Sequence, residues 1–306
     1  MKIGINGSGL LASPDLDLLK GDIAAAESDG FASYWLAQTG LVDALSVFSA
    51  HGDTGSAAEL GTAVIPTWTV HPQVLAGQAL TTQAATGNRL VLGIGLSHEP
   101  AVVDRWKMKW ERPVRQMMDY LDILLPILET GKASHDGYFW SYEGEGPRLT
   151  DDPPKVMVAA LGEQMLKLTG SRTDGTILWC VGPKTIREHI APVINDAASA
   201  AGRLQPSIVC SIPVWVTDNP EPAREFLAQV LSIYAELPSY RRMLDIEGLH
   251  GLGELSIVGS EAEVAEGIAA VAESGATDFT AVLMGADPDE IAATRAAVVA
   301  AQAAHQ

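Results

Sequence analysis

Eight short runs of almost uninterrupted apolar residues are spread along the chain, each long enough for one buried strand. They cover residues 2–6, 33–37, 60–65, 90–94, 156–160, 176–181, 207–216 and 278–284. Strands with one wet face alternate apolar and polar positions, whereas strands buried on both faces read as continuous apolar runs. The pattern therefore predicts eight strands of a sheet that is covered on both sides.

The segments between these runs carry helical spacing. The clearest helix begins near Val114 and repeats apolar residues every three or four positions as far as Leu128, with Gly131 as its stop. Another is expected to start at Pro14-Asp15 and to bury Leu16, Leu19, Ile23 and Ala26 on one face. Strand and helix alternating eight times in about 300 residues predict an α/β fold, a (β/α)8 TIM barrel. An open doubly wound sheet is the alternative.

No Pro-, Gly- or Ser-rich linker interrupts this alternation, so a single domain over residues 1–306 is predicted. Two segments, 132–155 and 236–258, are longer than ordinary loops. Long excursions from a barrel commonly cover its functional site, and both are expected to act as lids.

The charge composition limits the kinds of molecule that the protein is expected to bind. The chain has 20 Lys and Arg against 38 Asp and Glu, a net charge of −18, which argues against nucleic acid and membrane surfaces. Neither a signal peptide nor an apolar run of about 20 residues is visible. Cys180 and Cys210 form no C-x-x-C pair, so a reducing cytoplasm is expected.

The strand ends offer mainly Gly, Ala and aromatic residues, with few acids or bases and no metal-ligand spacing. Since barrel active sites lie at the C-terminal ends of strands, this composition suits a planar cofactor that brings its own chemistry. His98 is the candidate acid or base, although a surface-loop histidine is the commoner explanation of such a residue. Trp68, Trp179 and Trp215 are candidates for the walls of an apolar substrate pocket, with core packing as the alternative.

One motif indicates a different kind of site, for a dinucleotide. Residues 7–12, GSGLLA, follow a strand and fit the dinucleotide fingerprint G-x-G-x-x-A. The helix start signal comes only at Pro14-Asp15, and the second strand ends at Ala37-Gln38 without an acid for a ribose. Dinucleotide binding is therefore disfavoured.

Two strand-to-helix turns are candidates for holding an anion, because small residues let backbone N–H groups approach it at a helix N-terminus. They are Ala159-Ala160-Leu161-Gly162 and Val181-Gly182-Pro183-Lys184. Ordinary turns would show the same residues.

Several segments resemble the luciferase-like monooxygenase superfamily. They are LGTAVIP (60–66), His71-Pro72, Gln78-Ala79 and GNRLVLGIG (87–95), and residues 160–166 and 174–176 are similar to actinobacterial F420-dependent oxidoreductases. The resemblance implies a barrel of the bacterial luciferase-like type, with insertion segments at the C-terminal rim, that binds FMN or the deazaflavin coenzyme F420. It also implies a homodimer.

The resemblance further implies positions for the cofactor. A cis peptide at Ala63–Val64 would lie behind the ring, flanked by the turn Gly95-Leu96-Ser97-His98. The ribityl-phosphate part would contact Ala159-Ala160-Leu161-Gly162 and Cys180-Val181-Gly182-Pro183, with Lys184 beside them. Because F420 carries a phosphate and a glutamate tail, a local positive patch is predicted from Lys155, Lys167, Arg172, Lys184 and Arg187.

The chain also departs from relatives that oxidise a sugar phosphate. Those relatives carry Asp-His at the end of the second strand and a glutamate after the fourth strand. This chain has Ala37-Gln38 at the first place, with Gln38 expected at the ring, and His98 near the second. The favoured hypothesis is an F420-dependent oxidoreductase that transfers a hydride between the cofactor and a small organic substrate such as an enone or imine. An FMN-dependent monooxygenase is the first alternative, and a non-catalytic flavin-binding barrel is the second.

Overall fold

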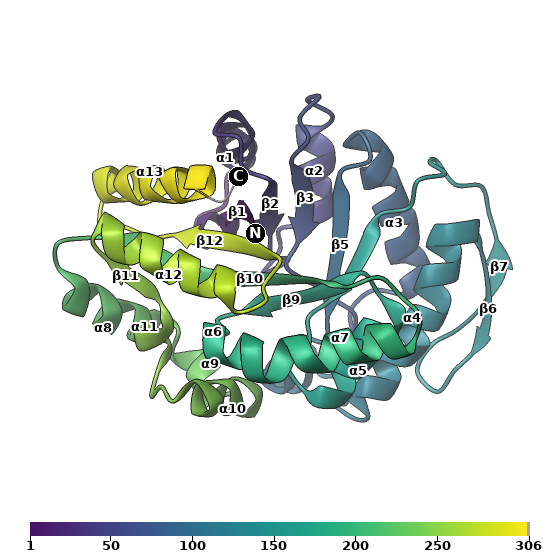
Figure 1. Cartoon of the computed structure of the whole chain (residues 1–306). Coiled ribbons are helices and arrows are strands. Elements are labelled where there is room, and N and C mark those ends of the chain that lie inside the picture. The colour runs from purple at the N-terminus through teal and green to yellow at the C-terminus, as the bar shows by residue number, and fades with distance from the viewer. Residues whose placement is uncertain (305–306) are drawn as a thin grey trace.

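The computed structural model describes residues 1–304, in which eight parallel strands close into a barrel ringed by helices (Figure 1). The strands are β1 (Lys2–Asn6), β2 (Ser33–Leu36), β3 (Glu59–Thr62), β5 (Leu90–Gly95), β8 (Lys155–Val158), β9 (Gly175–Trp179), β10 (Ser207–Val216) and β12 (Asp278–Leu283). β10 pairs with β9 on one side and with β12 on the other, which closes the ring. The predicted barrel is confirmed, and the open sheet is excluded.

Four short strands lie outside this ring. The predicted strand 60–65 breaks at the Ala63–Val64 peptide, which is cis, and resumes as β4 (Ile65–Pro66) beside β5. β11 (Ile257–Gly259) pairs with the outer end of β10. β6 (Lys132–Asp136) and β7 (Ser141–Glu145) form an antiparallel hairpin. The first half of the long segment 132–155 is therefore regular secondary structure and not a loop.

Helices alternate with the strands and cover the outside of the barrel. They are α1 (Leu16–Ser28), α2 (Ala44–His51), α3 (Pro72–Ala85), α4 (Pro113–Thr130), α5 (Glu163–Arg172), α6 (Pro183–Thr185), α7 (Ala191–Ala200), α8 (Pro220–Val230), α9 (Ser232–Glu236), α10 (Pro238–Glu247), α11 (Leu252–Leu255), α12 (Glu261–Glu273) and α13 (Pro288–Ala304). Short helical turns of other types are η1 (Gly7–Ala12), η2 (Ala101–Arg105) and η3 (Ile186–Ile190). No helix within residues 1–304 is long and apolar enough to cross a membrane.

The helix signals in the sequence act as expected. Asp15 caps α1 by accepting a hydrogen bond from Leu18 N at 2.8 Å, and α4 ends at Gly131, whose φ of 76° suits a residue without a side chain. α1 buries Leu19, Ile23 and Ala26, but Leu16, placed on the same face by its spacing, is half exposed at the first turn. The GSGLLA segment forms the isolated turn η1 and opens no long helix, which agrees with the exclusion of a dinucleotide fingerprint.

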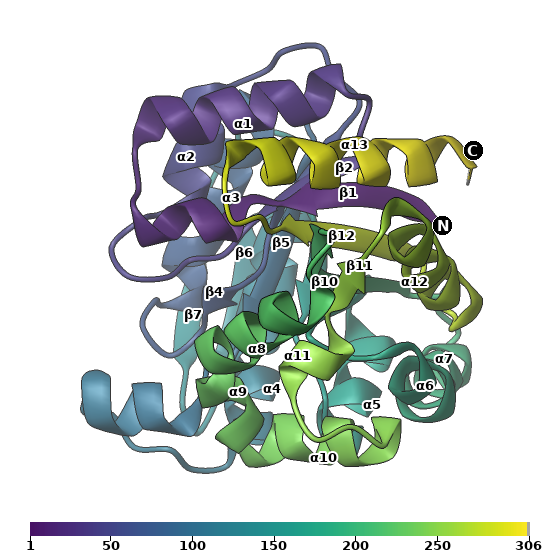
Figure 2. The same ribbon diagram turned by 90° about the vertical axis from the view of Figure 1, so that its left-hand side faces the viewer.

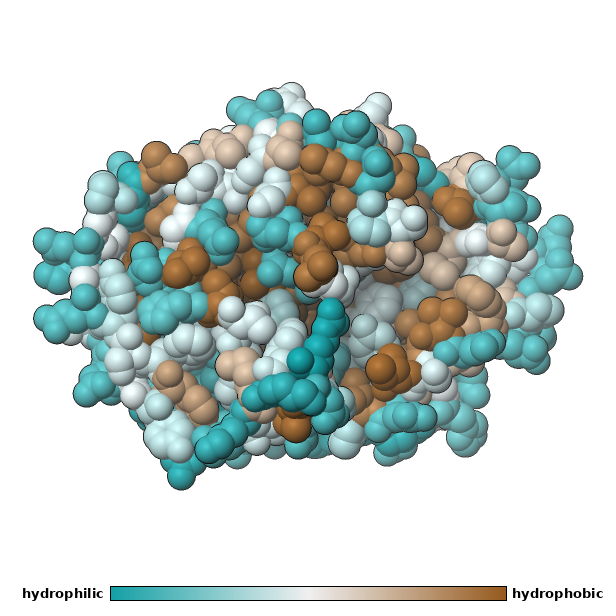
Figure 3. Space-filling model, turned by 180° about the vertical axis from the view of Figure 1, so that it is seen from behind, coloured by the Kyte–Doolittle hydropathy of each residue, from teal (hydrophilic) through white to brown (hydrophobic). Residues whose placement is uncertain are grey.

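The inside of the barrel is filled with side chains. Trp35, Val91, Met157, Ile177 and Val209 pack there as one buried cluster, on which Ala63 and Val64 rest. A filled barrel leaves no pore, so a ligand can reach only the rim. In Figure 2, β1 begins at the N-terminus on the right and runs to the left, and the other barrel strands are parallel to it. The left side of Figure 2 is the back of the molecule, so the C-terminal ends of the strands lie on the face that Figure 3 shows. Apolar residues gather around a hollow on that face.

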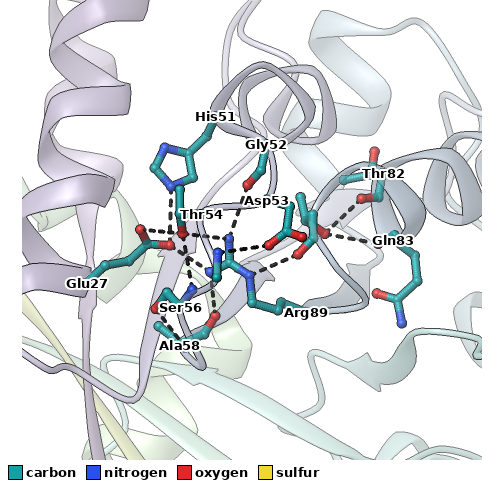
Figure 4. A network of polar contacts seen from close by, with 12 residues as sticks. Glu27, His51, Gly52, Asp53, Thr54, Ser56, Ala58, Thr82, Gln83 and Arg89 are labelled. Carbon is teal, nitrogen blue, oxygen red and sulfur yellow. Dashed lines mark hydrogen bonds and ion pairs between the residues drawn. The ribbon is translucent and has the colours of Figure 1, made fainter.

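The opposite face of the barrel holds a buried ion pair (Figure 4). Arg89, which precedes β5, donates to Glu27 at 2.6 Å and to the backbone oxygens of Gly52, Ala58 and Thr86. These contacts tie the loop before β3 to α1 and to the start of β5. Residues at this end of a barrel serve stability rather than chemistry.

Candidate functional site

The ends of β5 and β9 have an unusual backbone. Ser97 and Cys180, the second residue after β5 and the first after β9, adopt φ values of 59° and 50°, in the left-handed region that side chains rarely enter. Such a conformation costs about 1–3 kcal/mol and is found most often at functional sites. Both residues lie at the C-terminal rim, where a barrel carries its chemistry.

An aromatic cluster covers this part of the rim. His98 lies 5.7 Å from the ring centres of both Tyr234 and Tyr240, and the two tyrosines are 5.4 Å apart. Trp179 completes the group at 6.1 Å from Tyr234. The tyrosines come from α9 and α10, which lie side by side in Figure 2. These helices therefore close the rim above the ends of β5 and β9.

The cluster is uncharged at neutral pH. Burial lowers the pKa of His98, which favours the neutral imidazole. Burial likewise raises the pKa values of Tyr234 and Tyr240 and keeps their hydroxyls protonated. The groups available here can therefore donate protons while placing no fixed charge beside a bound ring.

The cis peptide lies where the resemblance places it, within a tight contact. A Cβ added to Gly95 would lie 2.6 Å from Val64 Cγ2 and 3.3 Å from the Cβ of Ala159. Three predicted cofactor residues thus meet at one point of the rim. The prediction of a cis bond at Ala63–Val64 is confirmed.

The other predicted cofactor residues differ in exposure. Leu96, Ser97 and Leu161 are partly buried, while Ala160, Cys180 and Val181 are enclosed in the core. At 2% exposed or less, the three enclosed residues offer almost no surface to a ligand.

Among the enclosed polar atoms that have no hydrogen-bond partner in residues 1–304, three belong to predicted site residues: Gln38 Oε1, Trp68 Nε1 and Trp179 Nε1. Gln38 and Trp68 follow β2 and β4, and Trp179 is the last residue of β9. Leaving such an atom unpaired costs about 1–3 kcal/mol. One acceptor and two donors at the rim suit a heterocycle with both N–H and C=O groups on its edge. The site thus fits a flavin or deazaflavin ring.

The three tryptophans differ in their surroundings. Trp179 adjoins the aromatic cluster, whereas Trp68 packs between Trp110 at 5.8 Å and Phe139 at 5.7 Å. Phe139 belongs to the tip of the β6–β7 hairpin, so that excursion covers Trp68. Trp215 packs against α8 and donates its ring N–H to Glu290 at 2.8 Å. Trp215 therefore has a packing role, and the pocket assignment is not retained for it.

The two strand-to-helix turns that are candidates for holding an anion differ in whether their amides are free. At α5, Gly162 is exposed, no side chain caps the helix, and a Cβ at Gly162 would meet nothing within 4 Å. At α6, the carboxylate of Glu247 accepts from Lys184 N at 3.1 Å, Thr185 N at 2.8 Å and Thr185 Oγ1 at 2.7 Å. The amides of Lys184 and Thr185 therefore bind the chain's own carboxylate, which disfavours a phosphate there, and the role of Cys180-Val181-Gly182-Pro183 stays a prediction.

Three of the five residues of the predicted positive patch are paired with carboxylates. Lys155 pairs with Glu59 at 2.6 Å, Lys167 with Glu163 at 2.6 Å and Arg172 with Asp122 at 2.8 Å. Lys155 begins β8 and so lies at the end of the barrel away from the rim. Sequence proximity to the turns did not reveal these carboxylate partners.

Two other clusters have acidic residues. A hollow of about 700 Å³ near the first turns of α8, α12 and α13 is lined by Asp218, Glu261, Asp287 and Asp289, which disfavour an anion. Asp119 accepts from Phe139 N at 2.8 Å and from Arg115 at 2.9 Å, beside His135. These contacts anchor the hairpin to α4.

Comparisons with known proteins give the class. Residues 4–278 match the family model described as luciferase-like monooxygenase, and the chain belongs to this family. A Mycobacterium tuberculosis protein provisionally named a coenzyme F420-dependent oxidoreductase is 33% identical over 234 residues, which are 69% of this chain and 66% of that protein.

Solved structures share the fold. The coenzyme F420-dependent tetrahydromethanopterin reductase of Methanopyrus kandleri superimposes with a TM-score of 0.80 at 17% identity, covering 99% of this chain and 98% of that one. A type II Baeyer–Villiger monooxygenase of Pseudomonas putida, in complex with FMN, gives 0.76 at 16% identity, covering 98% and 97%. F420 and FMN proteins both share this barrel.

Sequence reasoning missed Tyr234, Tyr240 and Glu247. They lie in or beside the long excursion before β11, far along the chain from the strand ends they meet. The length of that excursion was the signal available.

Proposed function

We propose that this protein is an F420-dependent oxidoreductase that transfers a hydride between the deazaflavin and a small organic acceptor such as an enone or imine. The observation that carries the proposal is the uncharged rim with unpaired polar atoms for a heterocyclic ring, in a chain of the luciferase-like monooxygenase family. The name of the 33% identical mycobacterial relative favours F420 over FMN.

In this proposal the ring lies against Ala63–Val64 and Gly95, with Gln38 Oε1 and Trp179 Nε1 as partners for its polar edge. The phosphate is held by the uncapped amides at the start of α5, next to Gly162. The β9–α6 turn takes no part, because Glu247 fills it.

When bound, the cofactor supplies a hydride. The chain's own residues position the acceptor and exclude water, through Trp179 and the aromatic cover from α9 and α10. His98 holds the proton that the reduced acceptor needs.

Fluorescence titration with F420 beside FMN, combined with measurement of oxygen uptake, tests the proposal. We expect saturable F420 binding, weaker FMN binding, and oxidation of reduced F420 by an enone or imine without oxygen consumption. Tighter FMN binding with oxygen uptake would replace the proposal with a monooxygenase. Binding without turnover of any acceptor would indicate a non-catalytic flavin-binding barrel.

A further inference from the structure

Gln116 carries a buried amide whose nitrogen end has no partner. The residue lies in the first turn of α4 and is fully enclosed, and its Nε2 donates to no acceptor among residues 1–304. Its Oε1 accepts from Thr67 Oγ1 at 3.1 Å, which leaves the N–H groups as the unused end of the amide. Thr67 N in turn donates to the carbonyl of Gly95 at 2.9 Å, and Gly95 adjoins the proposed ring position. The unused donors therefore lie close to the ring site, and enclosed donors without an acceptor call for an explanation.

A second enclosed donor follows Thr67 directly. Trp68 Nε1 has no partner within residues 1–304 either, and the proposed ring position does not use it. The rings of Trp110 and Phe139 lie 5.8 and 5.7 Å from that of Trp68 and cover it. Both covering residues belong to excursions from the barrel, namely the segment before α4 and the tip of the β6–β7 hairpin. A ligand that reaches Trp68 therefore has to displace these covers and leaves the barrel strands in place.

The start of α4 adds positive charge to the same region. Pro113 begins the helix, no side chain caps it, and its first turn holds no acid. The N–H groups of Val114 and Arg115 donate to no acceptor in the part of the chain that the structure describes, so they present the positive end of the helix dipole. Arg112 precedes the helix, with its guanidinium 4.9 Å from the ring centre of Tyr138, and it forms no ion pair with a described carboxylate.

The carboxylates of this region, those of Asp119 and Glu111, already have partners. Asp119 accepts from Arg115 at 2.9 Å and from the backbone N–H of Phe139 at 2.8 Å. Glu111 is exposed and accepts from the hydroxyl of Tyr138 at 3.4 Å. The unpaired groups around Trp68 and the start of α4 are thus donors and a cation. Negatively charged oxygen atoms are the ligand chemistry that such a set selects.

We propose that Gln116, Trp68 and the N-terminus of α4, with Arg112 beside it, form a carboxylate site for the substrate. The assignment to the substrate rests on the proposed function. The acceptor is then an enone or imine that carries a carboxylate at the end away from the reacting bond. Its apolar body packs against the two covering rings. The carboxylate binds the unused donors, and this contact fixes how the reacting bond lies over the cofactor ring.

Binding of a probe that cannot be reduced tests the site without the cofactor. Phenylpropanoate has an aromatic body and a carboxylate, phenylpropanamide is its neutral match, and isothermal titration calorimetry measures both. Gln116→Glu keeps an oxygen for Thr67 and replaces the unused nitrogen with a negatively charged oxygen. We expect it to weaken phenylpropanoate binding at least about tenfold and phenylpropanamide binding less than about twofold. Gln73→Glu, the same change at an exposed position in the first turn of α3, should leave both unchanged.

Arg112→Gln provides a second variant, because it changes an exposed residue and leaves the enclosed atoms in place. We expect phenylpropanoate binding to weaken about tenfold. Arg105→Gln is its control, since Arg105 is also exposed and without an ion pair in the described residues but lies in η2, away from the start of α4. Equal losses in these two variants would overturn the site, because they would show an effect of overall charge. Equal binding of phenylpropanoate and phenylpropanamide by the parent protein would overturn it as well.

Turnover with F420 tests the assignment to the substrate. Benzoylacrylate is an enone with a carboxylate, and its methyl ester is the neutral match. The parent protein should show the lower KM for the acid, and Gln116→Glu should remove this preference while the F420 dissociation constant stays within about twofold. A weakened F420 affinity with an unchanged preference would overturn the assignment, since the glutamate tail of the cofactor would then be the carboxylate bound. If the parent protein binds phenylpropanoate through Gln116 but neither binds F420 nor reduces an acceptor, the proposed function fails and the carboxylate site stands.

Discussion

At the scale of single residues, Arg89 is a buried charge whose hydrogen-bond donors all have partners or a paired carboxylate beside them. Its guanidinium reaches one carboxylate and three backbone oxygens, and its side chain is almost enclosed. Removing one partner of a buried pair leaves the other charge uncompensated, which is costlier than losing a surface pair.

Arg89→Met should therefore lower the free energy of unfolding by about 3 kcal/mol, measured by urea denaturation. Arg203→Met is the control, since Arg203 forms a more exposed pair with Asp174 at 3.2 Å and should cost less than about 1 kcal/mol. Equal effects in the two variants would contradict the role given to Arg89.

The same pair predicts a pH dependence. Burial raises the pKa of Glu27, but hydrogen bonds from Arg89, Thr54 and His51 outweigh it, and the net pKa is lowered. Glu27 therefore adds stability above its unfolded pKa of about 4.5, and that contribution is lost as the pH falls through the lower folded value. The difference in stability between the parent protein and Glu27→Gln should shrink below about pH 4. A constant difference down to pH 2.5 would contradict this explanation.

At the scale of elements, the eight barrel strands were predictable because each must bury both faces and so leaves a continuous apolar run. The hairpin β6–β7 has a polar outer face, and its strands left no such run. The roles of Tyr240 and Glu247 depend on where α10 docks, which is decided by contacts with Thr185 and His98 far away in the sequence. The turn at Gly162, which we propose holds the phosphate, was predictable from its glycine, but the occupation of the Gly182 turn by Glu247 was not.

The N-terminus of α5 gives a charge test of the phosphate position. Gly162→Asp places a carboxylate at an N-cap with room for a side chain and extended backbone (φ −81°, ψ 146°), so the fold should tolerate it. We expect F420 affinity to fall at least tenfold through repulsion. Gly162→Asn, with the same shape and no charge, should bind within about threefold of the parent. Equal titration curves for the two variants would place the phosphate elsewhere.

At the scale of the whole molecule, the proposed function brings an anionic cofactor to a chain with a net charge of −18, and three of the five basic residues expected to offset that charge are paired. Long-range repulsion should then slow association. Raising the salt concentration from about 0.01 to 0.15 M shortens the screening length from about 30 to 8 Å. The association rate of F420 in stopped-flow fluorescence should therefore rise with salt. A falling rate would show that a positive field dominates at the rim.

Glu247 has a consequence for the solution chemistry of the protein. Because it belongs to the same chain as the amides it binds, its carboxylate is present to them at an effective concentration of about millimolar or more. Acetate, sulfate or phosphate in a buffer would have to exceed that level to displace it. The turn after β9 therefore remains insensitive to the small anions around it, and anion competition experiments report on the rest of the rim.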